Sequence, residues 1–250
     1  MTNPCQKNHT KSKQTEQKMK LGIIGAMEVE VTSLRAAMKN RRDEQVGEFL
    51  FMLGEIEGVS CVLVRSGIGK VAAAVATQTM ILKYAPDLIV NTGVAGALSP
   101  RLTPGDIVIS ENAVQYDMDT SPLGDPVGLI SGINKIFFEA DKGAVSTLAR
   151  IAEEKTGKVL LGTVCSGDRF VASKDEKDRI LSLFESGVAC EMEGGAIAHT
   201  AYLSRTPFVI VRAISDSADG SSHMDYPTFL KQAAKTSFDI VYEFIKTNKM

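Results

Sequence analysis

The sequence predicts an α/β fold, a single domain with a central mixed β-sheet flanked by helices on both faces. Short apolar segments alternate along the chain with segments of helical periodicity, which is the pattern of a sheet covered by helices. In addition, two adjacent apolar segments, 48–56 and 59–65, flank the turn dipeptide Glu57-Gly58. They predict a hairpin, so the sheet should combine parallel and antiparallel pairs.

The elements follow in order from residue 21. The apolar run 21–25 ends in glycine and predicts a buried first strand. Residues 28–38 repeat apolar side chains at helical spacing, and 70–84 is rich in alanine, the best helix former. Further strands are predicted at 87–91, 106–111, 159–165 and 207–214. Further helices are predicted at 141–155, 174–186, 193–203 and 226–246.

Two segments fall outside this alternation. Residues 1–18 are polar and lack the apolar stretch of a signal peptide, so we expect a disordered tail before one domain over 19–250. Residues 113–135 are rich in Asp, Pro and Gly without clear periodicity. Loops of this length are usually functional or disordered, which predicts a substrate lid or a subunit contact, with a plain surface excursion as the alternative.

Composition narrows the function to small-molecule chemistry. The formal net charge of −2 over 250 residues gives no electrostatic footprint for nucleic acid or an anionic membrane. No apolar run approaches the roughly 20 residues of a membrane helix. The four cysteines and three histidines lack disulfide-framework or metal-ligand spacing, which predicts reduced thiols, a cytoplasmic protein, no metal and no organic cofactor.

Three glycine-rich turns follow predicted strands, at 22–25, 66–70 and 93–96. None has the spacing of a dinucleotide-binding or P-loop motif, so a dinucleotide or triphosphate site is not expected. Glycine does let backbone N–H groups approach a ligand closely. On spacing alone, simple turns and ligand contacts both stay open.

Carboxylates also gather where predicted strands end, and ligands of open α/β sheets bind at the carboxyl ends of strands. Any one of these acids could merely stabilise a helix N-terminus. Together, with one arginine and one serine, they predict a polar pocket. The residues concerned are Glu28, Glu30, Glu191, Glu193, Arg212, Ser215 and Asp216.

Six ordered motifs carry a resemblance to a known family. They are Gly22–Glu30, Ser66–Ala74, Asn91–Gly96, Ser166–Asp168, Glu191–Glu193 and Val211–Asp216. From about Lys20 to the C-terminus, the chain resembles the 5′-methylthioadenosine/S-adenosylhomocysteine nucleosidases of the nucleoside phosphorylase superfamily. The resemblance implies a homodimer that acts in methionine salvage. It also implies hydrolysis of the bond between adenine and a 5′-thio-substituted ribose.

The resemblance also implies a role for each matching residue. Asp216 would be the general acid that protonates the departing purine, oriented by Ser215. Glu30 would be the general base that activates water, with Arg212 positioning the water and the carboxylate. Glu193 would hold the ribose hydroxyls, helped by the backbone of Met192. Phe170 would stack on adenine, and the backbone of Val171 would contact the edge of the base. The remaining binding residues would be Met27, Ile68 and Tyr226 around the 5′ substituent, and Val94 and Glu191 in the pocket wall.

The chain departs from the family pattern at a few positions. Val94 stands where serine is common, Gly194-Gly195 replaces an Ala-Thr pair, and Tyr226 stands where phenylalanine is frequent. Segment 115–124 lacks the family's histidine and phenylalanine. These changes spare the acid and the base but alter the surroundings of the 5′ substituent.

Three other functions stay open. A purine nucleoside phosphorylase would transfer ribose to phosphate, which normally requires arginines beside the reacting carbon. A futalosine-type nucleosidase would differ in its 5′ pocket. A non-catalytic nucleoside-binding protein would have little need of a buried acid and base.

Overall fold

The computed structural model describes residues 19–219 and 226–248, with only the backbone described at 226–228. The predicted disordered tail, 1–18, therefore lies outside the described residues. Strands and helices alternate as expected and build one mixed sheet in a single domain, so the predicted fold class is confirmed. The strands are β1 (Lys20–Gly25), β2 (Lys39–Val46), β3 (Phe49–Ile56), β4 (Val59–Arg65), β5 (Leu88–Ala97), β6 (Ile107–Gln115), β7 (Phe138–Glu139), β8 (Val159–Ser166), β9 (Gly187–Glu191) and β10 (Phe208–Asp216).

The sheet is partly closed on itself. Its strands run in the order β10-β6-β8-β9-β5-β1-β4-β3-β2, and β10 pairs with β5 as well as with β6. This extra pairing closes β10, β6, β8, β9 and β5 into a ring, from which β1 and the antiparallel strands β4, β3 and β2 extend. Because β5 pairs with β1, β9 and β10, it lies at the junction between the ring and the extension.

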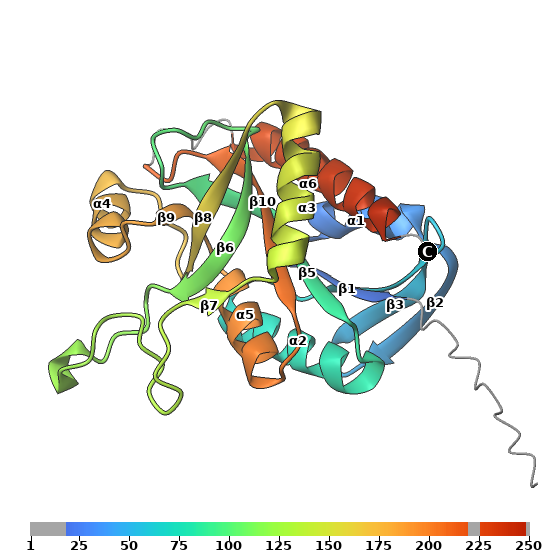
Figure 1. Ribbon diagram of the computed structural model, residues 1–250, viewed down its shortest axis with the longest axis horizontal. Helices are drawn as coiled ribbons and strands as arrows, with labels where there is room; N and C mark the ends of the chain where they lie inside the picture. The colour runs from blue at the N-terminus through green and yellow to red at the C-terminus, as the bar shows by residue number, and fades with distance from the viewer. Residues whose placement is uncertain (1–18, 220–225, 249–250) are drawn as a thin grey trace, which may run out of the picture.

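Helices cover both faces of the sheet (Figure 1). One group, α1, α3 and α6, packs together, and α2 and α5 pack together on the opposite side. α4 lies apart, beside β9 (Figure 1). No helix among the described residues has the length and apolar character needed to cross a membrane. The helices are α1 (Glu28–Ala37), α2 (Lys70–Tyr84), α3 (Lys142–Thr156), α4 (Lys174–Leu183), α5 (Gly194–Leu203) and α6 (Tyr226–Thr247).

The core is built around β1, β5 and β10. Every residue of β5 and of β10 is buried, as expected for strands covered on both faces. The polar side chains in these two strands are therefore exceptional, since a buried polar group is costly unless it finds a partner. They are Asn91, Thr92, Arg212, Ser215 and Asp216.

Several element boundaries differ from the predictions. β2 was not predicted, because Lys39–Val46 is almost wholly polar and has no apolar alternation. It occupies the end of the strand order, where charged side chains also discourage pairing with other chains. β5 continues to Ala97 instead of ending at residue 91. β6 continues to Gln115, into the segment 113–135 expected to be a loop.

The rest of that segment does form irregular structure. Beyond Gln115 it consists mainly of turns with one short 3-10 helix, Ser121–Leu123. It projects from the body of the molecule below β6 and β7 (Figure 1). The hairpin predicted around Glu57-Gly58 is confirmed, and both turn residues have positive φ, as in the tight turns favoured by strand twist.

Candidate active site

A cavity opens where β1, β9 and β10 end and where the second half of β5 passes. Eleven of the predicted site residues line it. They are Met27, Glu30, Ile68, Val94, Phe170, Val171, Glu191, Met192, Glu193, Ser215 and Asp216.

Glu30 is placed by the first turn of α1, which follows β1. Its Oε2 accepts hydrogen bonds from the backbone N–H groups of Ala26 and Met27, both at 2.8 Å. Its Oε1 accepts the N–H of Val94 in β5 at 3.1 Å. The carboxylate approaches β5 this closely because residue 93 is glycine: a Cβ there would lie 2.5 Å from Oε1. Three backbone donors therefore hold the carboxylate in one orientation.

The environment of Glu30 suits a proton acceptor. The side chain is almost fully buried, and burial raises its pKa. The positive charge of Arg212 and the three backbone donors oppose that rise without cancelling it. A carboxylate whose pKa moves upward toward neutrality accepts a proton more readily.

Glu193 immediately precedes α5 and is also buried. Its Oε1 accepts the N–H of Gly69 at 2.9 Å, from the turn that leads into α2. Burial, and after it the negative charge of nearby Glu191, raise the pKa of Glu193 to about 7. Arg212 and the Gly69 N–H act in the opposite direction. When ionised, this carboxylate can accept hydrogen bonds from hydroxyl groups in the cavity.

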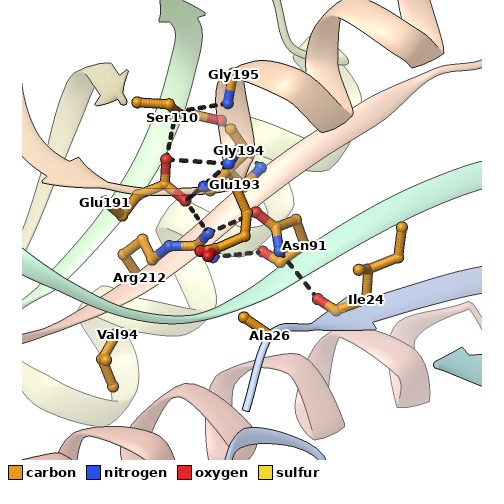
Figure 2. Close-up of polar contacts among 12 residues, drawn as sticks. Ile24, Ala26, Asn91, Val94, Ser110, Glu191, Glu193, Gly194, Gly195 and Arg212 are labelled. Atoms are coloured by element: carbon orange, nitrogen blue, oxygen red, sulfur yellow. Dashed lines mark hydrogen bonds and ion pairs between the residues drawn. The ribbon is translucent and has the colours of Figure 1, made fainter. Parts of the chain in front are cut away.

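Glu191, the last residue of β9, has both oxygens engaged within the protein (Figure 2). They accept the N–H groups of Glu193 at 3.1 Å and of Gly194 at 2.8 and 3.0 Å. Ser166 and Arg212 also donate to this carboxylate, the latter as a buried ion pair. Glu191 thus neutralises Arg212 and caps the N-terminus of α5, where a negative charge is favourable.

Arg212 lies behind the cavity wall and does not line the cavity. Its Nη2 donates to Glu191 and, at 2.6 Å, to Oδ1 of Asn91. The Asn91 amide in turn donates to the carbonyl of Ile24 at 3.0 Å (Figure 2). One buried polar chain therefore ties β10, β9, β5 and β1 together. A Cβ on Gly93 would lie 3.4 Å from Arg212 Nη1. The arginine therefore reaches the same point of β5 as Glu30.

Asp216 ends β10 and lines the same cavity. Its Oδ2 accepts the hydroxyl of Ser215 at 2.8 Å, and its Oδ1 accepts the N–H of Ala218 at 2.9 Å. Both contacts come from its own strand end and the turn that follows. They fix the orientation of the carboxyl group.

The remaining wall is apolar and more exposed. Ile68 is 59% exposed and Phe170 is 50% exposed, while Val171 is buried. Met27 completes this side of the cavity. For Tyr226 the backbone begins α6, but the side chain lies outside the described residues, so its predicted contact with the 5′ substituent stays a prediction.

Sequence reasoning missed three contributors. Asn91, Ser166 and Gly69 belong to motifs that carry the family resemblance, but the sequence assigns none of them a role of its own. All three act through contacts with residues distant in the sequence. The one sequence signal for such a role is a polar residue inside an apolar strand, and it applies to Asn91 and Ser166. Within the described ranges, no group of three His, Cys, Asp or Glu side chains is arranged to hold a metal ion.

Comparison with known proteins shows the family of the chain. The family model of the phosphorylase superfamily matches residues 20–246. A 5′-methylthioadenosine/S-adenosylhomocysteine nucleosidase of Shewanella loihica is 38% identical over 234 residues, covering 91% of this chain and 99% of that protein. The nucleosidase of Neisseria meningitidis, solved with methylthio-immucillin-A, is 40% identical with a TM-score of 0.88, covering 91% of this chain and 99% of that one.

A third structure broadens the comparison. The futalosine hydrolase of Helicobacter pylori is 31% identical with a TM-score of 0.87, covering 92% of this chain and 98% of that one. The same fold thus carries a hydrolase with a different name. The resemblance found in the sequence is nevertheless confirmed at higher identity. By these matches, the chain belongs to the 5′-methylthioadenosine/S-adenosylhomocysteine nucleosidase family of the phosphorylase superfamily.

Proposed function

We propose that this chain is an N-glycosyl hydrolase that cleaves 5′-methylthioadenosine and S-adenosylhomocysteine into adenine and the corresponding 5′-thio-ribose. One observation carries the proposal: Glu30 and Asp216 line one cavity, from the start of α1 and the end of β10. The names of the relatives supply the substrates.

The carboxyl groups of Asp216 and Glu30 have separate roles in the reaction. Breaking the N-ribosidic bond leaves positive charge on the sugar and negative charge on the base. Asp216 gives a proton to the purine, and Glu30 removes a proton from the attacking water. This is the acid and base arrangement of inverting glycoside hydrolysis.

The other residues bind and orient. Glu193 accepts the ribose hydroxyls beside the backbone of Met192, and Ser215 orients Asp216. Arg212 supports Glu30 by its charge, and Glu191 completes the wall behind the ribose. Phe170 stacks on adenine and Val171 reads its edge. Met27, Ile68, Val94 and Tyr226 surround the ribose and its 5′ substituent.

The charges in the site favour water over phosphate as the nucleophile. A phosphate would have to lie against the buried Glu30 carboxylate, which repels it. The buried Arg212 is already bound to Glu191 and Asn91. Among the described residues that line the cavity, the cation is Arg169, which pairs with Glu176 beside the proposed purine site.

A product assay tests the reaction. The protein is incubated with methylthioadenosine, with and without inorganic phosphate, and adenine and the sugar product are measured. We expect equal adenine release in both and a free 5′-thio-ribose. Cleavage that requires phosphate would establish a phosphorylase, and no adenine release would indicate a nucleoside-binding protein.

A futalosine-type activity is the second candidate, because a futalosine hydrolase shares this fold at 31% identity. The two activities differ in the 5′ substituent, which would face the exposed side of the cavity. A substrate panel that varies this group, with release of the free purine base as the signal, separates them. A kcat/KM for futalosine above that for methylthioadenosine would replace our assignment.

The assembly we propose is a homodimer. Ile68 lines both the cavity and a neighbouring surface hollow, which also includes Val71 and Val75 of α2. Val71 is 75% exposed and Val75 is 49% exposed, so this apolar surface continues from the mouth of the cavity. A second copy would cover it, and the projecting segment 113–135, which does not line the cavity, would add to the contact.

Oligomeric state tests this part of the proposal. Val71→Asp places a charge on the surface and should convert the dimer to monomer in light scattering, with a raised KM. A wild-type monomer at micromolar concentration would refute it. We also place the protein in the cytoplasm, since Cys61, Cys165 and Cys190 are buried free thiols. Its role in methionine salvage is proposed from the name of its relatives, which act on 5′-methylthioadenosine.

A further inference from the structure

The motif Ser166-Gly167-Asp168 has no part in the proposed chemistry, yet its two polar side chains contact residues next to or in contact with Glu193. We propose that Ser166 and Asp168 are positioning residues for Glu193, and that this turn thereby governs recognition of the ribose hydroxyls. The inference rests on the proposed function for one point, the assignment of Glu193 to the ribose.

Ser166 acts on the backbone of Glu193. It ends β8 and is fully buried, and its hydroxyl donates to Glu191 while accepting the N–H of Gly195 at 2.5 Å. The same Glu191 carboxylate accepts the N–H groups of Glu193 and Gly194 (Figure 2). Ser166 therefore fixes the carboxylate that holds the first turn of α5, from which Glu193 extends.

Asp168 acts on the carboxylate of Glu193. Its Oδ1 accepts the N–H of Lys70, the first residue of α2, at 2.7 Å. The preceding N–H, that of Gly69, donates to Glu193 Oε1 at 2.9 Å. Two successive N–H groups at the start of α2 therefore donate to two different carboxylates, that of Gly69 to Glu193 and that of Lys70 to Asp168. If Asp168 were lost, the turn that presents the Gly69 N–H would lose its anchor.

Asp168 is itself held in place. Its N–H donates to Oδ2 of Asp117 at 2.9 Å, and Oδ1 of Asp117 forms an ion pair with Nζ of Lys70 at 2.6 Å. Gly69 has a φ of +97°, and a Cβ there would lie 3.1 Å from Asp168 Oδ1. This backbone conformation favours glycine, and the close approach leaves little room for a side chain.

Ordinary helix capping is the alternative explanation, and the chain offers a matched control for it. Asp141 precedes α3 and accepts the N–H of Ala144 at 2.8 Å, which is the same kind of contact. No residue of α3 lines the cavity. Asp141→Ala should therefore lower stability as Asp168→Ala does, without any effect on the ribose.

The experiment measures recognition of the ribose hydroxyls directly. Dissociation constants are determined for an adenine C-nucleoside, which cannot be hydrolysed, for its 2′,3′-dideoxy counterpart, and for adenine alone. In Ser166→Ala and Asp168→Ala we expect the preference for the hydroxylated nucleoside to fall about 10-fold, the order of one hydrogen bond to a charged group. Adenine affinity should stay within about twofold, because the base contacts are untouched.

Three outcomes decide the matter. Asp168→Asn should restore the preference, because its amide oxygen can still accept the Lys70 N–H. An unchanged preference in both alanine variants, or an equal loss in Asp141→Ala, overturns the inference. Glu193→Gln tests the proposed function separately from this inference. If this variant keeps the preference for the hydroxylated nucleoside, the ribose role of Glu193 is wrong. Asp168 is exposed, so its variants should remain folded.

Discussion

The two sides of the cavity are built differently. The ribose wall, formed by Glu30, Glu191 and Glu193 with Arg212 behind it, is buried and joined by hydrogen bonds from strand ends and helix starts. The outer rim, formed by Met27, Ile68 and Phe170, is more exposed and apolar. The wall holds charges in one geometry, which catalysis of one bond cleavage requires. The rim can accommodate different substituents, and Ile68 joins it to the surface proposed for a second subunit.

The largest effect should come from Asp216. Asp216→Asn removes the transferable proton while the amide can keep the contact with Ser215. We expect kcat to fall by about 10³-fold or more, within the range of general acid catalysis, with substrate affinity within a few-fold of wild type. Single-turnover adenine release and substrate binding measure the two quantities. Near-normal turnover would place the acid elsewhere.

A comparable effect is expected from Glu30. In Glu30→Gln the side chain binds no proton, so kcat should fall by about 10²- to 10⁴-fold while nucleoside still binds. The amide NH₂ of glutamine would face backbone N–H groups that donate hydrogen bonds to the wild-type carboxylate. These donors would lose their acceptor, so the melting temperature should fall. Calorimetry and adenine release test both statements. Rapid hydrolysis by this variant would exclude Glu30 as the base.

The pH dependence of nucleoside binding tests the proposed role of Glu193. Its pKa is raised to about 7 by burial and by Glu191, and the ionised form accepts ribose hydroxyls. Nucleoside affinity should therefore fall below pH 7, by up to about tenfold per pH unit. In Glu193→Gln, nucleoside affinity should be independent of pH between 5 and 8. It should equal the lower affinity that the wild type shows below pH 7.

The stability of the free protein should change in the opposite direction. Because the folded-state pKa of Glu193 is above its unfolded value, its contribution is fully present below about pH 4.5 and is lost as the pH rises through about 7. The difference between wild type and Glu193→Gln in melting temperature should follow this course. A wild-type advantage that grows with pH would contradict the assignment.

The smallest effect should come from the rim. Phe170→Ala removes an aromatic face from the proposed purine site and should raise KM by about 3- to 10-fold, the order of one stacking contact. The kcat should change less than twofold, because the ribose wall is intact. Phe170→Tyr serves as the control and should retain the wild-type KM. A large loss of kcat in Phe170→Ala would mean that rim and wall are not separable.

Much of the fold and of the candidate site was accessible from the sequence. The apolar runs predicted β1, β3, β4 and β10, and the carboxylates that follow such runs predicted residues that line the cavity. The Lys39–Val46 strand could not be predicted, because it owes its conformation to pairing with β3 and not to its own polar residues. The position of Arg212 behind the wall was equally inaccessible, since nothing local to Val211–Ala213 indicates its partner.

Local pattern thus determined which carboxylates lie at or just after the ends of β1, β9 and β10, because side-chain periodicity is a property of a few neighbouring residues. Tertiary structure decided which of them meet. Glu193 is held by Gly69, which is 124 positions away, and Arg212 by Asn91, which is 121 positions away. Such pairs form only when the ring of strands closes and brings separate strand ends and turns to one cavity, so their roles depend on contacts between distant parts of the chain.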